Sequence, residues 1–283
     1  MRTISQKELQ DILAKHKKWL LCRNGGERAN LSNVDLRNVN LCGVNLARAD
    51  MSDADLCRVD LQSANLQYAN FQNAKLQYAN LRATDLKFAN LQRADLAQAN
   101  LPIADLRNAR LRGAKLHSVK LLGADLQEAD LQYATLSYVD LRETNLRQTN
   151  FVGACFQCAN LTNASLFEAK LCRAEFRGTN LHGTDLYRAD IDGSVYRPWL
   201  IIADHIGNQA EKVLYFADYD NVRYGCWNAR KGGTLDEFRK YVDEIYSAER
   251  CGLLHNTEYL SAIKMFSSMR ESYLKSAEKE KEQ

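Results

Sequence analysis

The segment ADMSDADLCRVDLQSANLQYAN, residues 49–70, shows a five-residue repeat. A large apolar residue stands at every fifth position, and this register runs unbroken from Leu31 to Ile191, filled only by Leu, Phe, Met or Ile. Two residues before each large residue stands Ala, Val or Thr, and the residue between them is mostly Asp or Asn. More than half of the chain is therefore built from five-residue units.

A period of five fits neither an amphipathic helix, with 3.6 residues per turn, nor an alternating strand, with a period of two. Fixed self-similarity is typical of a repeat architecture, in which each unit buries its apolar side by stacking on its neighbours. We expect the large residues, such as Leu31, Leu56 and Leu121, to fill the axis of a narrow coil. The small residues let the backbone close around them, and Asp or Asn suits a turn because its side chain bonds the local backbone.

The units ADLCR, ANLQY, ADLQE and TDLYR resemble the pentapeptide repeat family, whose pattern is A(D/N)LXX. This resemblance implies an all-β solenoid, a right-handed quadrilateral β-helix with four pentapeptides in each coil. The unbroken register then predicts about eight coils, and a spacing of about 4.8 Å between coils gives a rod on the order of 35–40 Å long.

Four segments are predicted along the chain: an N-terminal capping helix at 1–26, the pentapeptide repeat β-helix at 27–196, a small α+β module at 197–273 and a charged tail at 274–283. The helix is expected over 5–22, with Ser5 and Glu8 forming a capping box and Gly25–Gly26 ending it. Its apolar face comprises Leu9, Ile12, Leu13, His16, Trp19 and Leu20. Because Lys15, Lys17 and Lys18 are basic, docking to a partner or a membrane surface is the alternative role.

The segment after the repeats predicts an α+β module. Strands are expected at Leu200–Ala203, Val213–Ala217 and Val222–Trp227, with Asp220–Asn221 turning the last two into a hairpin. Thr234 followed by Glu237 predicts a helix start, and a second helix is expected from about Asn256–Thr257. The segment is similar to C-terminal modules of bacterial and phage pentapeptide repeat proteins, and this similarity brings no activity with it.

Composition narrows the classes of function. A net charge of +3 is too small to indicate a nucleic-acid partner. The eight Cys, in a chain without a secretory segment, predict reduced thiols in the cytoplasm. The N-terminus has no apolar signal region, and no run approaches 18 apolar residues, so no membrane association is expected.

Two groups of surface residues are candidate partner-binding sites. The first contains aromatic residues, Tyr68 and Phe88 on one face and Tyr78 on another, with Tyr138 on that second face three coils on; they mark a contact surface or stack on their neighbours. The second is a basic cluster without an acid, which wraps one coil and could meet phosphate or an acidic partner. Its members are Arg107, Arg110, Arg112, Lys115 and Lys120. The alternative is a solvated coil balanced by Asp105 and Asp125.

No residue set predicts catalysis, a cofactor or a metal. Cys155 and Cys158 form a C-x-x-C with Cys172 near the next coil, but a zinc site needs four ligands and the cysteines are interpreted as incidental thiols. In the C-terminal module the only conceivable constellation is His205, Asp218, Asp220, Cys226 and His255.

These observations favour a non-catalytic protein–protein interaction scaffold, in a regulatory or phage–host setting, with an unidentified protein partner and a homodimer through the C-terminal module as a further contact. The family resemblance supplies an alternative, a DNA mimic that binds DNA gyrase or topoisomerase IV. Mimicry needs a strongly negative surface, whereas residues 27–196 hold 19 acidic and 19 basic side chains. An enzyme site in the C-terminal module is the second alternative.

Overall fold

The structure, a computed structural model, describes residues 1–181, 184–186, 188–190, 200–206, 211–216, 221–224, 234–237, 239, 240 and 267. The chain divides into two compact units, Met1–Val195 and Tyr196–Gln283, and each is described by itself. In the described residues no helix combines the length and the apolar character needed to cross a bilayer.

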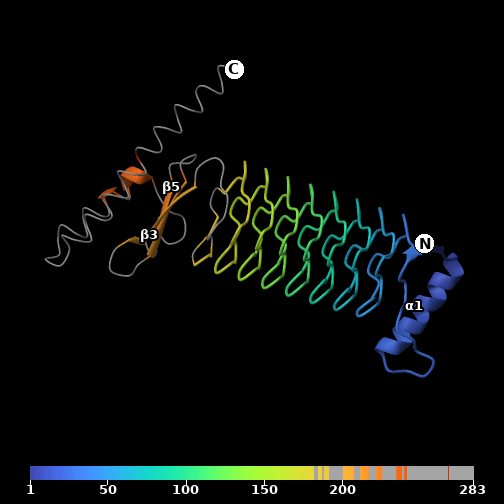
Figure 1. Ribbon diagram of the computed structural model, residues 1–283. Helices are drawn as coiled ribbons and strands as arrows, with labels where there is room; N and C mark the ends of the chain where they lie inside the picture. Colours follow the sequence, from blue (N-terminus) through green and yellow to red (C-terminus); the bar gives the residue numbers. More distant parts are fainter. Residues whose placement is uncertain are drawn as a thin grey trace, which may run out of the picture. The chain divides into compact units, whose positions relative to one another are not determined.

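The first unit is a stack of coils (Figure 1). Parallel bridges join residues twenty apart, beginning with Asn30 and Asp50 and ending with Lys170 and Asp190. The Leu31 N–H donates to the Asp50 carbonyl oxygen at 2.7 Å, and the same bond recurs along the stack. One coil therefore contains four pentapeptides, as predicted.

The interior of the stack is filled by the repeated large residues. From Leu31 to Leu186 none of them is more than 5% exposed. In the last coils three aromatic side chains join the Leu residues in the interior: Phe156 stacks on Phe176 with ring centroids 4.8 Å apart, and Phe151 meets Phe156 edge-on. The predicted inward positions of Leu31, Leu56 and Leu121 are confirmed.

Each pentapeptide ends in a turn. Two residues after the large residue the backbone takes a positive φ, 57° at Tyr68 and 68° at Gly153 for example. The turn closes where the next small residue donates its N–H back to the large one, as Ala54 does to Met51. The Asp or Asn oxygen accepts the N–H two residues on, as Asp60 does from Gln62 at 3.0 Å. Four such turns per coil give the stack four sides.

The N-terminal segment covers the first coil. Strand β1 (Arg2–Thr3) pairs in parallel with β2 (Val34–Asp35), so it takes the place of a preceding coil on that side. Helix α1 (Gln6–Leu20) follows, and Ser5 caps it by accepting the Glu8 N–H at 3.1 Å, as predicted.

The predicted end of this helix was wrong. The helix ends at Leu20, and Cys22 takes the left-handed conformation with φ 51°. The Arg23 N–H donates to the Lys18 carbonyl at 2.9 Å and the Cys22 N–H to that of Trp19 at 3.0 Å, which is a Schellman motif with Cys in the glycine position. Gly26 serves a different purpose, because a Cβ there would lie 2.4 Å from the Trp19 nitrogen.

The contact between helix and coils is made by His16, which is fully buried. Its Nδ1 accepts the Ala29 N–H at 3.0 Å, while Nε2 has no hydrogen-bond partner among the described residues. Burial lowers the pKa of His16, because the charged imidazolium is poorly solvated there. Leu9 is also buried on this face.

The second unit contains a three-stranded antiparallel sheet in the order β3 (Leu200–Ile206), β4 (Glu211–Phe216) and β5 (Asn221–Tyr224). The predicted hairpin is confirmed, since β4 pairs with β5. The strand boundaries differ from the prediction. Strand β3 continues to Ile206, and β5 begins at Asn221, because that residue already pairs with Phe216.

A capping box marks the helical segment that follows. The Thr234 N–H donates to Glu237 Oε2 at 2.8 Å, and Thr234 Oγ1 accepts the Glu237 N–H at 3.1 Å, as predicted. The predicted second helix from Asn256–Thr257 and the tail at 274–283 lie outside the described residues apart from residue 267.

Candidate interaction surfaces

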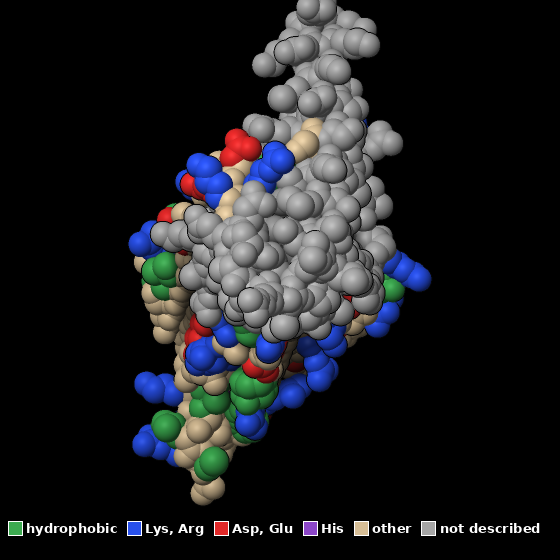
Figure 2. Space-filling view, turned by 90° about the vertical axis from the view of Figure 1, so that its left-hand side faces the viewer, with side chains coloured by type: hydrophobic (Ala, Val, Ile, Leu, Met, Phe, Trp, Pro, Cys, Tyr) green, Lys and Arg blue, Asp and Glu red, His purple; other side chains and the backbone are tan. Residues whose placement is uncertain are grey.

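The outer surface of the stack is made of columns, each formed by residues twenty positions apart. In the part of the stack that Figure 2 leaves uncovered, Lys and Arg side chains project at the edges and apolar side chains lie between them. The functional question is which columns leave side chains free to meet a partner.

One column carries a continuous set of stacked side chains, Arg48, Tyr68 and Phe88, here called the Tyr68 ladder. The Arg48 guanidinium carbon lies 5.3 Å from the centre of the Tyr68 ring. Tyr68 and Phe88 stack nearly parallel with centroids 4.8 Å apart, yet they remain 49% and 44% exposed. These aromatic residues therefore stack on one another, as one of the two interpretations predicts, and they remain exposed.

Half a coil away Arg58 and Tyr78 form a second set, here called the Tyr78 pair. The Arg58 guanidinium carbon lies 5.6 Å from the centre of the Tyr78 ring. The pair borders an open hollow of about 570 Å³. The hollow is lined by Arg37, Asn38, Asp55, Cys57, Arg58, Lys75, Gln77 and Tyr78. Farther along the same column Tyr138 is also exposed and meets His117 edge-on.

Sequence reasoning missed this hollow, although a signal for it exists. Aligning residues at a spacing of twenty places the small Cys57 between the longer Arg37 and Gln77 in one column. A short side chain between two long ones leaves a depression. Burial, followed by hydrogen bonding to Asp55, raises the pKa of the Cys57 thiol to about 11, so at neutral pH it stays protonated.

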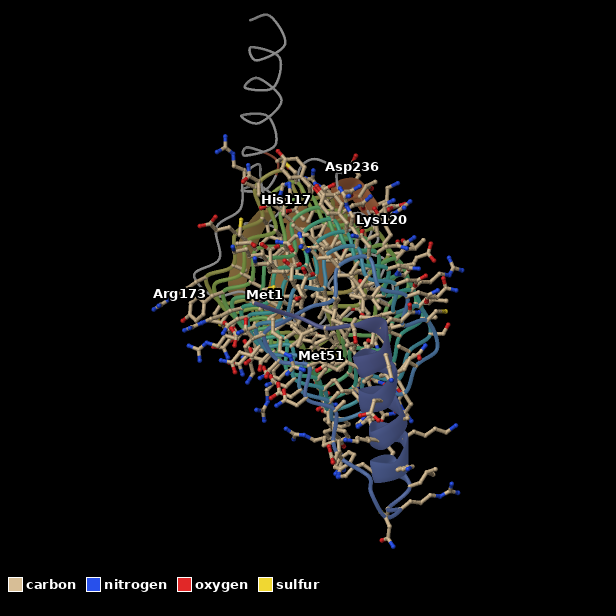
Figure 3. All side chains as sticks on the ribbon, turned by 90° about the vertical axis from the view of Figure 1, so that its right-hand side faces the viewer. Met1, Met51, His117, Lys120, Arg173 and Asp236 are labelled. Atoms are coloured by element: carbon tan, nitrogen blue, oxygen red, sulfur yellow. The ribbon has the colours of Figure 1, made fainter. Side chains whose placement is uncertain are left out.

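The cations of the basic cluster are spread around one coil and do not share one face. His117 and Lys120 already lie on different faces of the stack (Figure 3). Arg107 contacts Asp105 at 2.7 Å and Asp125 at 3.7 Å, and Lys115 lies 3.7 Å from Asp95. Arg112 lies over the ring of Tyr133. Arg110 and Lys120 are exposed and form no ion pair with any described residue.

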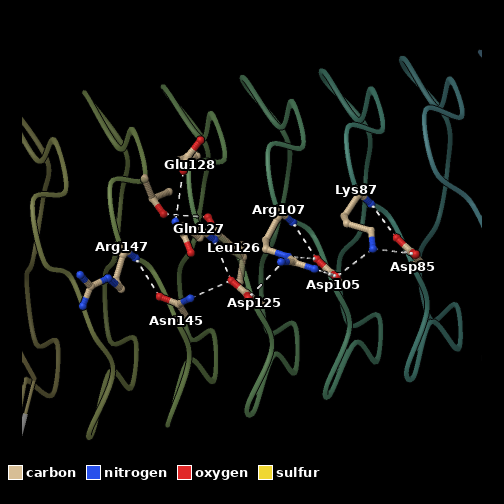
Figure 4. A network of polar contacts seen from close by, with 11 residues as sticks. Asp85, Lys87, Asp105, Arg107, Asp125, Leu126, Gln127, Glu128, Asn145 and Arg147 are labelled. Carbon is tan, nitrogen blue, oxygen red and sulfur yellow. Dashed lines mark hydrogen bonds and ion pairs between the residues drawn. The ribbon is translucent and has the colours of Figure 1, made fainter.

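On the face that holds Arg107, cations and carboxylates alternate and contact one another (Figure 4). Lys87 bridges Asp85 at 3.1 Å and Asp105 at 3.5 Å, and Arg107 continues the series toward Asp125. Partial burial alone would raise the pKa of Asp105, but hydrogen bonds from Arg107 outweigh it and hold the pKa below its ordinary value. These cations are occupied by their own neighbours.

The cysteines do not assemble a metal site in the described part of the chain, where no group of three metal-ligating side chains occurs. Cys155 lies 3.8 Å from the Ser137 hydroxyl, and the Cys172 thiol donates to Asp190 at 2.9 Å. Of the constellation considered in the C-terminal module, Asp218, Asp220, Cys226 and His255 lie outside the described residues, as does the side chain of His205.

Comparison with family models identifies the repeats. The model for pentapeptide repeats matches in eight copies, over residues 27–62, 64–101, 103–132, 124–163 and 159–195. The chain belongs to the pentapeptide repeat family. Its members fold as right-handed quadrilateral β-helices, in agreement with the coil that the bridges describe. The search of curated proteins gives no match.

Several known pentapeptide repeat structures are similar to this chain. HetL, from the cyanobacterium Nostoc sp. strain PCC 7120 and involved in heterocyst differentiation regulation, has 28% identity over 63% of this chain and 92% of its own, with a TM-score of 0.46. QnrB1, a plasmid-mediated fluoroquinolone resistance protein, has 18% identity over 59% of this chain and 78% of its own, with a TM-score of 0.40. Rfr23 from Cyanothece 51142 has 30% identity over 41% and 87%, with a TM-score of 0.24.

Proposed function

We propose that this pentapeptide repeat protein is a non-catalytic scaffold that acts by binding another protein on the outside of its coils. The observation that carries the proposal is the filled interior: from Leu31 to Leu186 the large positions are buried and occupy the axis. A closed axis leaves no internal site for a substrate, so recognition falls to the exterior.

The exterior residues best suited to a protein partner are the Tyr68 ladder and the Tyr78 pair. Tyr and Arg are enriched among residues that dominate protein–protein binding, since they combine a large apolar area with directed hydrogen bonds. Stacking fixes their side chains beforehand, which lowers the entropy lost on binding. The cations around Arg107, by contrast, are engaged by Asp105 and Asp125.

Site-specific photo-crosslinking tests the proposal. Benzoylphenylalanine replaces Tyr68, Tyr78 or, as a matched control, Asn73, which is exposed and has the same positive φ on a different corner. After irradiation in a lysate of the native cell, adducts are identified by mass spectrometry. We expect one protein species in the adducts from Tyr68 or Tyr78, absent from those of Asn73 and competed by added wild-type protein.

Equal labelling from all three positions, or adducts that wild-type protein does not compete, would contradict a specific binding surface. A regulatory or phage–host setting remains part of the proposal, and the identity of the crosslinked partner tests it. A homodimer through the C-terminal module is a separate part of the proposal, which the molar mass of the full-length protein in solution tests.

The gyrase-binding alternative is not favoured by the surface. DNA mimicry needs a dense series of negative charges, whereas the acids Asp85, Asp105 and Asp125 are interleaved with Lys87 and Arg107. We therefore expect purified protein neither to inhibit the supercoiling reaction of DNA gyrase nor to protect it from a quinolone.

A further inference from the structure

The hollow beside Tyr78 spans three successive coils on one side of the stack. Its floor lies at Cys57, whose thiol donates to Gln77 Oε1 at 2.9 Å. That contact directs the Gln77 carbonyl oxygen toward the thiol and leaves its amide N–H groups free to donate elsewhere. The floor is therefore small, and one of its walls offers hydrogen-bond donors.

Three cations line the hollow. Arg37 is held in place by Asp35, which accepts from Nε at 2.9 Å and from Nη2 at 2.6 Å, so that Nη1 has no acceptor among the described residues. Arg58 is positioned over Tyr78 and forms no ion pair within the described part of the chain. Lys75 completes the border.

Only one carboxylate lines the hollow, that of Asp55, and both of its oxygens are engaged by neighbouring groups. Asp55 is 8% exposed, and its Oδ1 accepts the Cys57 N–H at 3.2 Å within the turn. Its Oδ2 is 3.8 Å from the Lys75 nitrogen, a loose contact with an exposed ammonium. The three cations face the two carboxylates of Asp35 and Asp55, which leaves one net positive charge.

We infer that this hollow binds a side-chain carboxylate of an acidic segment in the partner protein. A guanidinium stacked on an aromatic ring keeps its N–H edge available and fixed in direction, and this fork matches a carboxylate. One net positive charge matches a monoanion better than a phosphate group, which carries about two negative charges at neutral pH. The inference rests on the proposed scaffold function and specifies the chemistry of its partner.

Peptide binding to the full-length protein tests the inference. The probe is a blocked, fluorescently labelled triglutamate peptide, followed by anisotropy at low salt, with triglutamine and triphosphoserine peptides as comparisons. We expect triglutamate to bind, triglutamine not to bind, and Arg58→Gln to weaken triglutamate at least tenfold, since a charge-assisted hydrogen bond is lost. Arg58→Lys should weaken it less, because the charge stays and only the fork is lost.

The matched control is Arg93→Gln. Arg93 occupies the same turn position with positive φ on another corner, is exposed, and forms no ion pair with a described residue. Gln is compatible with this conformation, because Gln98 and Gln148 adopt it in the protein itself. We expect Arg93→Gln to leave the dissociation constant within twofold of wild type.

Equal losses in Arg58→Gln and Arg93→Gln, or no triglutamate binding, would overturn the inference, and tenfold tighter binding of triphosphoserine would overturn the choice of carboxylate. Crosslinking from Tyr68 alone, without Tyr78, would also overturn it. In each of these cases a specific partner captured at Tyr68 leaves the scaffold function standing, so the two proposals fail separately.

Discussion

The inside and the outside of the coils follow the same five-residue period but obey different rules. Inside, each large residue has the same task, and Leu56 and Leu121 are equally buried although they lie 65 residues apart in the sequence. Outside, residues at the same position of the repeat differ in their surroundings: Arg107 is tied to two carboxylates, while Arg147 lies over the ring of Phe167. The interior preserves the fold, and the exterior is free to specialise.

The largest loss of stability is expected when an aromatic side chain is removed from the axis. Phe156 is fully buried and packs on both Phe151 and Phe176. Phe156→Ala should lower the free energy of unfolding by about 3–5 kcal/mol, through lost burial and the cavity left behind. Urea denaturation followed by circular dichroism measures the change.

The exterior counterpart is Tyr138→Ala, which truncates a ring that is 55% exposed. Ala is compatible with this turn position, since Ala83 adopts the same positive φ. We expect its denaturation midpoint to move by well under half of the shift caused by Phe156→Ala. Similar shifts for both variants would show that the outer rings carry the fold as much as the axis does.

A second test addresses the turn at Gly153, an exterior position that has no room for a side chain. Gly153 has φ 68°, and a Cβ there would lie 2.8 Å from two atoms of the Tyr133 ring. Gly153→Ala should cost about 1–2 kcal/mol for the left-handed backbone conformation and about 0.5–1.5 kcal/mol more for displacing the ring from its rotamer.

Gly43 separates these two contributions. It has φ 67° with nothing within 4 Å of an added Cβ, so Gly43→Ala meets only the backbone cost. Truncating Tyr133 in the Gly153→Ala background should remove the excess, which a double-mutant cycle in urea measures. An excess that persists without the ring would place the strain in the coil backbone instead.

The same contrast explains what could be predicted from the sequence. The coils were predictable because an inward residue depends on a period that one sequence displays, as at Leu31 and Leu121. The hollow was missed because its parts, Arg37, Cys57 and Gln77, become neighbours only through the twenty-residue offset and through side-chain orientations. The alternative interpretation of the basic cluster did name Asp105 and Asp125, which Arg107 contacts, whereas the contact of Lys115 with Asp95 arises only from the twenty-residue offset.

The end of helix α1 shows a third limit. Gly25–Gly26 is a strong local stop signal, yet the chain turns earlier, at Cys22, with φ 51°. The reason is tertiary: Gly26 passes so close to the Trp19 backbone that no Cβ fits. A glycine chosen for a close approach looks the same in sequence as one chosen to end a helix.

A third test concerns His16 of helix α1, which is buried where the helix contacts the first coil. Because burial favours the neutral ring, the unfolded chain binds the proton more readily than the folded one. The free energy of unfolding should therefore be unaffected by this group above about pH 6.5 and fall progressively as the pH drops below it. His16→Asn keeps an acceptor for the Ala29 N–H but does not titrate, so the difference between wild type and variant isolates His16. Parallel pH profiles for the two proteins would contradict a buried neutral imidazole.

The smallest effect is expected where the exterior neutralises itself. Arg107 is exposed, so Arg107→Gln should destabilise the protein less than Gly43→Ala does, because a solvated ion pair gains little over its hydrated partners. The loss should shrink further at 1 M NaCl, where the screening length falls to about 3 Å. Arg147→Gln is the matched control, since the Arg147 guanidinium lies 4.2 Å from the centre of the Phe167 ring and packs on an apolar surface. Its effect in urea denaturation should be nearly independent of salt. If both variants respond to salt alike, the contacts of Arg107 with Asp105 and Asp125 do not stabilise this face electrostatically. The distinction between cations that are paired within the protein and cations that are free to bind a partner would then fail.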